Sequence, residues 1–506
     1  MPLLRRRFSL VASFALLLVC SLQALADPAG EIDRLIRNAR IGDATVTVHA
    51  IDLRTGAPIV AVDPGTPMIP ASNMKLLSTG AALVVLGPDF VFRTRLETDG
   101  ERLILVGDGD PALGDPRMLE STAATFSVDD ILDALARAAA DQASEPYTEL
   151  VIDDRVFDRQ TVHPGWPRDQ LDRHYAAPVA GVSLNGNVLS FFPAPSPSGA
   201  GQPATFTLEP RSTALAREVE VTAQSVASGT NRIWIRRDPV ENRFTLGGAV
   251  RSPSQVRLRV AIHDPSVFAG HILAERLAEQ ESRRSGSRAQ TLTPRLADPQ
   301  ETFDNARTLA VVTTPLADVL TLCNTDSINL YAEALLKRIA HESTGEPGSW
   351  SGGATVMRMV LAQRLGPTAA ASTRVSDGSG LSRDNAVSAE TFTAWLRSLW
   401  LDPTLRDPFL ESLAEPGEGT LRSRFARTKL ENSVAAKSGS INGVRTLSGY
   451  LLNDRTGQGY AFSILINDLP LSGSATTNAR ALHEAIVAVL DEHLAERTTA
   501  SVPTSE

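Results

Sequence analysis

The sequence predicts an α/β (α+β) fold that is split in sequence by an inserted β-rich region. Helical and strand patterns alternate near both ends of the chain, whereas short alternating segments between turns dominate its middle. The chain has 506 residues, of which 42% are hydrophobic and 21% are charged. This composition is typical of a globular protein, and the length is sufficient for more than one domain.

The first 26 residues have the pattern of a secretory signal peptide. Three arginines precede an apolar stretch over residues 8–19, and residues 24–26 supply the small side chains of a cleavage site. A membrane anchor is less favoured, because roughly 20 apolar residues are needed to span a bilayer. Lipidation at Cys20 is also less favoured, because Val19 stands where bacterial lipoproteins usually have a small residue. We expect a secreted protein that begins at Asp27.

Residues 27–95 are expected to form the first segment of the catalytic domain. A helix is predicted over residues 31–40, followed by a strand over 44–52 and its hairpin partner over 58–63. The apolar run over residues 72–86 predicts a buried helix, which the following Gly-Pro pair ends.

Residues 96–285 are expected to form the inserted β-rich domains. Short alternating segments bounded by turn residues predict strands there. These segments are residues 102–106, 150–153, 205–208, 219–223, 232–236 and 256–262. The polar stretch over residues 280–299 is expected to be an exposed connection.

Residues 286–495 are expected to return to the catalytic domain, and residues 496–506 to form a disordered tail. Apolar residues at helical spacing and then three alternating runs predict four helices, three adjacent strands and a closing helix. The helices are 315–323, 327–341, 353–365 and 388–401, the strands are 434–437, 446–452 and 460–466, and the closing helix is 478–494.

Several classes of function are disfavoured. The formal net charge of −9 gives no basic surface for nucleic acid or for an anionic membrane. The eight histidines show no metal-binding spacing, and neither a P-loop nor a G-x-S-x-G motif is present. We therefore expect no metal and no cofactor. Cys323 lies in an apolar helical pattern, which favours a buried side chain over a nucleophile.

Lysine is scarce in this chain and therefore informative. Only four of the 49 basic residues are lysines, so arginine serves almost wherever a positive charge suffices. A buried lysine can lose its proton, which arginine does not do. Lys75 follows Ser72 by three positions at the start of an apolar helix, so both side chains lie on one face. Ser72 is the predicted nucleophile, and Lys75 is its predicted base, whose pKa burial would lower. Lys337 and Lys429 are interpreted as lysines without a catalytic role.

Two later motifs strengthen this interpretation. Ser327-Ile328-Asn329 begins a predicted helix and offers a hydroxyl and a carboxamide. Lys437-Ser438-Gly439-Ser440 follows on a predicted strand, where Gly439 permits close approach to a ligand. In this order the motifs reproduce the S-x-x-K, S-x-N and K-[ST]-G set of serine acyltransferases that act on penicillin.

From about residue 30 to 495 the chain resembles the class C low-molecular-mass penicillin-binding proteins, which are D-alanyl-D-alanine carboxypeptidases and endopeptidases often called DacB. The resemblance extends beyond the three motifs and implies the transpeptidase fold shared by penicillin-binding proteins and β-lactamases. The gap between Ser72 and Ser327 fits the inserted domains of this family and is far longer than in class A β-lactamases. Further similar segments are residues 106–111, 175–178, 183–185, 329–333, 377–382, 419–421 and 444–450.

Three positions depart from the family pattern. Ile328 stands where the family commonly has Asp, at a position expected to point away from the substrate. Thr325 stands near a position where the family often has a lysine, and the missing charge would alter the electrostatics beside Ser327. Ser438 replaces the commoner threonine of the third motif and keeps the hydroxyl group. None of these changes removes a functional group that the reaction needs.

The resemblance implies a role for each motif residue. Ser72 would attack the penultimate carbonyl of a stem peptide ending in D-Ala-D-Ala, and Lys75 and Ser327 would pass the proton to the leaving D-alanine. Asn329 would bind the acyl-side amide and help to keep Lys75 in place, and Gly439 would allow a ligand to approach closely. The terminal carboxylate would be held by Lys437, Ser438 and Ser440.

The expected protein is thus a periplasmic serine peptidase that acts on peptidoglycan and is inhibited covalently by β-lactams. A β-lactamase or esterase with the same active-site plan is an alternative. A wall-binding protein without activity is another.

Overall fold

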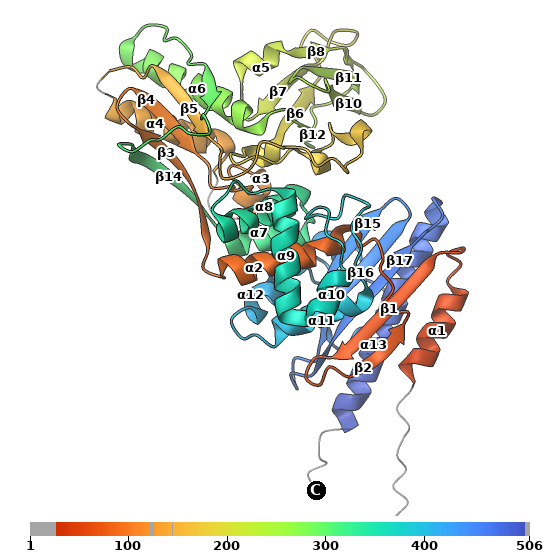
Figure 1. The fold of residues 1–506 in the computed structure, drawn as a ribbon. Coiled ribbons are helices and arrows are strands. Elements are labelled where there is room, and N and C mark those ends of the chain that lie inside the picture. Colours follow the sequence, from red (N-terminus) through yellow and green to blue (C-terminus); the bar gives the residue numbers. More distant parts are fainter. Residues whose placement is uncertain (1–26, 122–125, 144, 501–506) are drawn as a thin grey trace, which may run out of the picture.

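The computed structural model describes residues 27–121, 126–143 and 145–500, so the expected signal peptide, residues 1–26, lies outside the described residues. The chain forms two parts (Figure 1). Segments from both ends of the chain combine around one sheet in the first part, and the middle of the chain forms the second part with three further sheets. This architecture confirms the predicted α/β (α+β) fold with an insertion.

A five-stranded antiparallel sheet forms the centre of the first part. Its strands are β1 (Thr45–Asp52), β2 (Pro58–Val62), β15 (Ser433–Ile441), β16 (Val444–Leu452) and β17 (Gly459–Asn467). Their order in space is β15-β16-β17-β1-β2. Every residue of β17 is buried, as expected for a central strand covered on both faces. β1 pairs with β17, so the two ends of the chain share one sheet, and β15 forms an edge.

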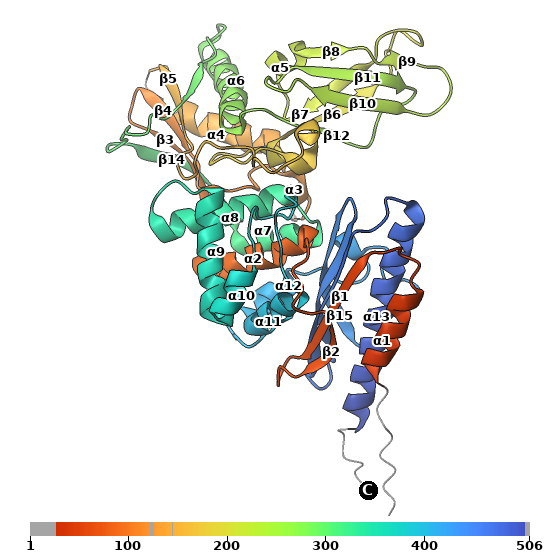
Figure 2. The same cartoon turned by 45° about the vertical axis from the view of Figure 1, so that its right-hand side comes forward.

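Helices cover both faces of this sheet (Figure 2). One face carries α1 (Pro28–Asn38) and α13 (Gly473–Ala500), and the other carries α2 (Met74–Leu86), α7 (Leu316–Thr325), α8 (Asn329–Thr344), α9 (Trp350–Leu365) and α11 (Ala389–Trp400). Because α13 continues to Ala500, the predicted disordered tail is wrong for residues 496–500. Residues 501–506 lie outside the described ranges.

The α2 helix is buried on all sides and is mostly apolar. Its residues from Met74 to Leu83 are all buried, which is typical of a helix inside a core. A short 3₁₀ turn, η1 (Ala71–Asn73), leads into the helix, and Gly87 ends it with a φ of 81°. The helix predicted over residues 72–86 is therefore present, with a tighter first turn that carries Ser72.

The second part contains a mixed five-stranded sheet and two smaller sheets. The larger sheet consists of β3 (Val91–Thr98), β4 (Arg102–Val106), β5 (Glu149–Asp153), β13 (Pro294–Leu296) and β14 (Arg307–Pro315), in the order β13-β5-β4-β3-β14. The smaller sheets consist of β6 (Val188–Ala194), β7 (Thr205–Glu209) and β12 (Leu258–Ala261), and of β8 (Val219–Val221), β9 (Gln224–Ser225), β10 (Arg232–Arg237) and β11 (Phe244–Val250).

The purely β-rich description of the insertion omitted two long helices, α4 (Val128–Gln142) and α6 (Pro265–Ser285). A capping box between Ser127 and Asp130 starts α4, and Gly286 in the left-handed region ends α6. Both signals are visible in the sequence. The stretch expected as an exposed connection, residues 280–299, contains the end of α6 and the strand β13.

The division of the chain at residues 95/96 and 285/286 stays a prediction. The strand pairing favours boundaries between the two parts near residues 90 and 316, because β3 pairs with β14 along its length and β13 pairs with β5.

The remaining elements are short: α3 (Pro116–Ser121), α5 (Thr213–Arg217), α10 (Pro367–Ser372), α12 (Arg406–Glu411), η2 (Arg168–Gln170), η3 (His174–Ala176), η4 (Asn185–Asn187) and η5 (Gly419–Leu421). Among the helices of the described ranges, none is both long and apolar enough to cross a membrane.

Candidate active site

A cavity of about 420 Å³ lies where η1, the start of α8, the edge strand β15 and the insertion meet. Four predicted site residues line this cavity, which we call the serine cavity: Ser72, Ser327, Asn329 and Ser440. Its other lining residues are Pro167, Gln170, Tyr175, Gly380, Leu381, Arg383, Ile441 and Asn442. The fold therefore brings residues of all three motifs together.

Lys75 lies directly beside Ser72. The Lys75 ammonium nitrogen is 3.1 Å from Ser72 Oγ, and the lysine side chain is fully buried. One helical turn separates the two residues, and the apolar α2 helix keeps the lysine stem in the core. The pair has the distance that proton transfer from a nucleophile to its base requires.

Two oxygen acceptors fix the orientation of the Lys75 amine. Asn329 Oδ1 accepts a hydrogen bond from Lys75 Nζ at 2.7 Å, and the backbone carbonyl of Ser379 accepts another at 3.0 Å. A neutral amine has two N–H bonds and one lone pair. Because carbonyl oxygens only accept, they take both N–H bonds and leave the lone pair directed at Ser72 Oγ.

Burial lowers the pKa of Lys75 from its usual value to about 8, and the nearby Cys323, Glu333 and Asp377 oppose this shift. The predicted direction of the shift is correct. A pKa of about 8 leaves roughly a tenth of the amine neutral at pH 7, so protonated Lys75 predominates in the resting enzyme at that pH. The neutral fraction grows as the pH rises.

Asn329 connects Lys75 to the insertion. Its Nδ2 donates to the backbone carbonyl of Tyr175 at 2.8 Å, and this carbonyl only accepts hydrogen bonds. The amide is therefore oriented with Nδ2 toward Tyr175 and with Oδ1 toward Lys75. The sequence predicted that Asn329 helps to place Lys75, but the contact with Tyr175 was not foreseen.

A buried carboxylate holds the carbonyl that faces Lys75. Glu333 accepts hydrogen bonds from the backbone N–H groups of Gly378 and Ser379, each at 2.8 Å, and from Trp350 Nε1 at 2.8 Å. These bonds fix the peptide segment whose Ser379 carbonyl binds Lys75. Burial and, to a smaller extent, the charge of the neighbouring Asp377 together raise the pKa of Glu333 to about 7. Glu333 is a positioning residue that the sequence reasoning did not assign.

Asp377 organises the rest of the same loop. It accepts from the backbone N–H of Gly380 at 2.8 Å, from that of Ser382 at 2.6 Å, and from Asn385 Nδ2 at 2.7 Å. Trp166 of the insertion donates its Nε1–H to Asp377 at 2.9 Å. The loop over residues 377–382 is thus fixed from both parts of the molecule.

Ser327 lies in the loop between α7 and α8, with a positive φ of 61°. It lines the serine cavity with its motif partner Asn329. Ile328 between them is only 6% exposed and packs in the hydrophobic core, so the expectation that it points away from the substrate agrees with the structure. Thr325 Oγ1 donates to the Thr321 carbonyl at 2.8 Å, within its own helix.

The third motif lies on β15, as expected, but Lys437 is not at the surface of the serine cavity. Its side chain is fully buried, and its Nζ donates to the backbone carbonyl of Ser438 at 2.8 Å. Burial and the charge of Lys75 hold the pKa of Lys437 well below its usual range. Ser438 and Gly439 line a second, smaller cavity, which Ser440 shares with the first.

Gly439 was expected to allow close approach to a ligand, and in the structure it lies close to other residues of the chain. A Cβ atom added at this position would lie 2.1 Å from Thr446 Oγ1 and 2.9 Å from the backbone nitrogen of Ser72. Thr446 in turn donates to the Pro70 carbonyl at 3.0 Å. The missing side chain of Gly439 therefore lets β15 contact the turn that carries Ser72.

Neither the one cysteine of the described residues nor a metal site offers an alternative catalytic centre. Cys323 is buried, and desolvation raises the pKa of its thiol to about 12, so it is not a ready thiolate. Within the described ranges, no group of three or more His, Cys, Asp or Glu side chains has the arrangement of a metal site.

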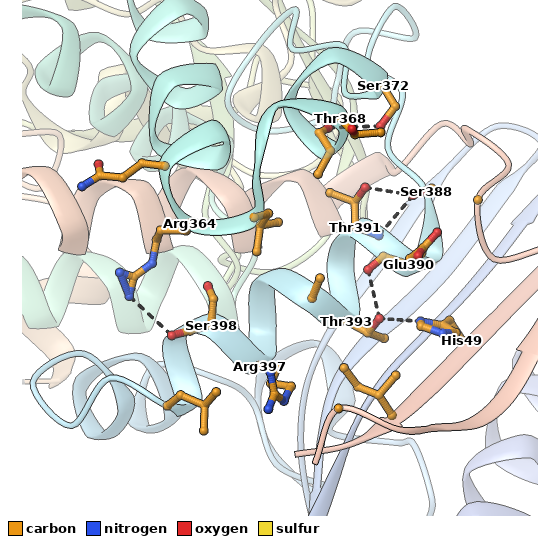
Figure 3. Close-up of a pocket in the computed structure, with 18 of the residues that line it drawn as sticks. His49, Arg364, Thr368, Ser372, Ser388, Glu390, Thr391, Thr393, Arg397 and Ser398 are labelled. Atoms are coloured by element: carbon orange, nitrogen blue, oxygen red, sulfur yellow. Dashed lines mark hydrogen bonds between the residues drawn. The ribbon is translucent and has the colours of Figure 1, made fainter. Parts of the chain in front are cut away.

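A larger cavity of about 1080 Å³ lies between β1, α10 and α11 (Figure 3). It contains a histidine–hydroxyl pair, since His49 Nδ1 is 2.6 Å from Thr393 Oγ1. Thr393 is fully buried and donates to the backbone carbonyl of Glu390 at 3.0 Å. This hydroxyl is therefore a structural link between α11 and β1 and not an accessible nucleophile.

Comparisons with known proteins identify the family of the chain. The chain matches the model of the D-Ala-D-Ala carboxypeptidase 3 (S13) family over residues 29–492. It is 30% identical to the D-alanyl-D-alanine carboxypeptidase of Actinomadura sp. (strain R39) over 460 residues, which cover 85% of this chain and 80% of the relative. It is 25% identical to the D-alanyl-D-alanine carboxypeptidase DacB of Haemophilus influenzae over 421 residues, which cover 79% and 81% of the two chains.

Among solved structures, penicillin binding protein 4 (dacB) from Haemophilus influenzae superimposes with a TM-score of 0.69 at 22% identity, covering 90% of this chain and 99% of that one. This similarity confirms the penicillin-binding-protein fold. The family match spans nearly all described residues, and the fold and the three motifs agree with it. The chain therefore belongs to the D-Ala-D-Ala carboxypeptidase 3 (S13) family.

Proposed function

We propose that this chain hydrolyses the D-Ala-D-Ala bond of peptidoglycan stem peptides through an acyl-enzyme on Ser72. The observation that carries the proposal is the position of Lys75 Nζ, which lies 3.1 Å from Ser72 Oγ and donates to Asn329 and Ser379. Once the amine is neutral, this position directs its lone pair at Ser72. Membership of the S13 family supplies the substrate class.

Acylation begins when neutral Lys75 accepts the proton of Ser72 and Oγ attacks the carbonyl carbon of the penultimate D-alanine. The backbone N–H groups of Ser72 and Ser440 bind the oxyanion in this proposal, and β15 approaches the Ser72 nitrogen closely at Gly439. One such donor is worth about 3 kcal/mol of transition-state stabilisation.

The leaving D-alanine then needs a proton. Ser327 lines the same cavity as Ser72 and is proposed to relay the proton from Lys75 to the departing amine.

Asn329 is proposed to bind the acyl side of the substrate. Its Nδ2 has a second N–H bond besides the one donated to Tyr175, and this second N–H is proposed to donate to the carbonyl of the acyl-side amide. Water then attacks the ester, with Lys75 as the base, and frees Ser72.

The same attack on a β-lactam ring gives the inhibited acyl-enzyme. Penicillin binding protein 4 of Haemophilus influenzae has been solved in complex with a β-lactam. We propose that this chain is acylated at Ser72 by the same class of compound. We also propose that residues 1–26 direct the chain to the periplasm, where its substrate lies.

Digestion of purified muropeptides tests the proposed reaction. The mature chain is expected to release D-alanine from pentapeptide stems, and cutting of cross-linked dimers would show endopeptidase activity in addition. Ser72→Ala is the matched control and is expected to release neither product.

Two outcomes would contradict the proposal. Rapid turnover of a chromogenic cephalosporin without release of D-alanine would identify a β-lactamase. Absence of both hydrolysis and penicillin labelling in the wild type would exclude the proposed reaction, and it is the result that a wall-binding protein without activity predicts.

A further inference from the structure

A second cavity, of about 110 Å³, adjoins the serine cavity and shares Ser440 with it. We call it the arginine cavity. Its volume is about a quarter of the 420 Å³ of the serine cavity, so it suits a small group such as a carboxylate. Its lining residues are Thr420, Ser423, Arg424, Ser438, Gly439, Ser440, Arg445, Thr446, Arg480 and His483.

Buried polar atoms without a partner are concentrated around this cavity. Thr420 Oγ1, Arg445 Nε and both ring nitrogens of His483 have no hydrogen-bond partner among the described residues. His483 is only 1% exposed. Buried polar groups almost always have partners in folded proteins, and leaving one unsatisfied costs about 1–3 kcal/mol. The cavity therefore offers donors to an oxygen-rich ligand.

The arginine cavity also carries uncompensated positive charge. Arg424 is paired with Glu484 at 2.6 Å. Within the described part of the chain, by contrast, neither Arg445 nor Arg480 forms an ion pair; Arg445 donates to the backbone carbonyls of Ile441 and Val444 instead. Two guanidinium groups without a carboxylate partner attract an anion.

His483 is a neutral donor in this setting. Burial, together with the charges of Arg424, Arg445 and Arg480, holds the pKa of His483 well below its usual range. A neutral imidazole has one N–H bond to give. The histidine therefore adds a hydrogen bond but no charge, and the charge comes from the arginines.

Lys437, which the motif suggested as the carboxylate anchor, is placed differently. Its ammonium group is fully buried, donates to the Ser438 carbonyl, and lines neither cavity. Ser438 and Ser440, two positions apart on β15, both line the arginine cavity, and Ser440 pairs in register with Arg445 of β16. Both motif serines thus line the arginine cavity, and Ser440 lines the serine cavity as well.

We propose that the arginine cavity binds the C-terminal carboxylate of the substrate, and that Arg445 and Arg480 supply the positive charge that recognises it. This inference rests on the proposed D-Ala-D-Ala hydrolysis. Ser440 connects the two cavities, so the carboxylate lies in one while the scissile carbonyl lies beside Ser72 in the other. Arg445 and Arg480 are then specificity residues for a free carboxylate.

The test compares two substrates, a diacetylated tripeptide ending in D-Ala-D-Ala and the same tripeptide with a C-terminal amide. The measured quantity is the ratio of kcat/KM for the acid to kcat/KM for the amide. Arg445→Met and Arg480→Met are each expected to lower this ratio about 10- to 100-fold, the range for loss of one charged hydrogen bond. Arg445→Lys keeps the charge and is expected to retain more of the ratio than Arg445→Met.

Arg422→Met is the matched control, because Arg422 is exposed, lies near the cavity in sequence and does not line it. It removes the same net charge and is expected to leave the ratio unchanged. Arg480 is itself exposed, so its variant tests the proposal even if Arg445→Met fails to fold.

An unchanged ratio in Arg480→Met and in folded Arg445 variants overturns the carboxylate assignment. An equal fall in Arg422→Met also overturns it, because the effect would then be a general one of net charge. Failure of the wild type to hydrolyse either tripeptide would instead contradict the proposed function, so the two failures are distinguishable.

Discussion

At the scale of single residues, the reactivity of Ser72 depends on how Lys75 is held. The Asn329 and Ser379 oxygens fix both N–H bonds of the amine, and burial lowers its pKa to about 8. Each feature alone would be insufficient. A lowered pKa supplies the neutral amine, and the two acceptors direct its lone pair at Ser72 Oγ.

The pH dependence of acylation follows from this pKa. Neutral Lys75 is the reactive form, so the rate constant for Ser72 acylation is expected to rise with pH and to level off above about pH 8. Stopped-flow acylation by a β-lactam with a constant charge in this range measures the profile. A rate that is independent of pH from 6 to 9 would contradict the role of Lys75, because the neutral fraction of a group with a pKa of about 8 changes over that range.

Lys75→Arg separates charge from basicity. Arginine keeps the positive charge but stays protonated, so it does not accept the Ser72 proton. Acylation is expected to slow about 10²- to 10⁴-fold, the usual contribution of a general base. Lys429→Arg is the matched control, because Lys429 lines none of the described cavities around Ser72. Wild-type acylation by Lys75→Arg would refute general-base catalysis by this lysine.

Glu333→Gln tests the support of the Ser379 carbonyl. The new amide group would face N–H donors where the carboxylate accepts from Gly378, Ser379 and Trp350. Acylation is expected to fall about 10- to 100-fold, from loss of one or two charged hydrogen bonds. Glu346→Gln, at an exposed site, is the control. Unchanged acylation in a folded Glu333→Gln variant would remove Glu333 from the positioning network.

At the scale of elements, the active site depends on how closely β15 approaches η1. Gly439 allows this approach, because a Cβ atom there would meet Thr446 Oγ1 at 2.1 Å and the Ser72 nitrogen at 2.9 Å. The motif glycine thus positions the nucleophile before any ligand binds. Its spacing in the sequence identified the motif, but only the structure identifies what the glycine contacts.

Gly439→Ala is expected to force β15 away from Ser72. Overpacking of this kind costs about 1–3 kcal/mol of unfolding free energy, and acylation is expected to slow as the Ser72 turn shifts. Thermal unfolding and β-lactam acylation measure the two effects. Gly473→Ala is the matched control, because a Cβ atom there meets nothing within 4 Å. Equal stability and acylation in both variants would show that β15 tolerates the added methyl group.

The elements themselves were largely predictable where periodicity was strong. The helix that carries Lys75 and the strand that carries Lys437 were both expected, because apolar runs of the right length leave few alternatives. The α4 helix was missed although Ser127 and Asp130 form its capping box, because the surrounding short strands suggested a uniform β region.

At the scale of the whole molecule, the insertion takes part in the active site. Tyr175 accepts from Asn329, and Trp166 donates to Asp377 in the loop that supports Lys75. Lys337 on α8 also binds Asp158 of the insertion at 2.5 Å. Residues of both parts therefore hold the catalytic groups in place. The two parts lie against each other near α3 and α8 (Figures 1 and 2).

Trp166→Phe tests this connection. It keeps an aromatic ring but removes the hydrogen bond to Asp377, so unfolding free energy is expected to fall by about 1 kcal/mol or more and acylation to slow. Chemical denaturation and acylation kinetics measure both. Trp234→Phe, at a site 47% exposed, is the control. Normal acylation in Trp166→Phe would show that the insertion does not support the catalytic loop.

These contacts between parts could not be predicted from the sequence. The three motifs were recognisable because their side chains are chemically distinctive and occur in a fixed order. The Tyr175 and Ser379 carbonyls have no such signature, since every residue carries the same backbone acceptor. The lining of the arginine cavity comes from η5, β15, β16 and α13, and only folding brings these segments together.

Formation of the acyl-enzyme on Ser72 can be tested by mapping the acylated residue. Trypsin would release the peptide from Thr55 to Lys75, in which Ser72 is the only serine. After incubation with benzylpenicillin, mass spectrometry is expected to find the added mass on this peptide in the wild type and on no peptide in Ser72→Ala. Labelling of the peptide that contains Ser327, or equal labelling of Ser72→Ala, would show that Ser72 is not the nucleophile.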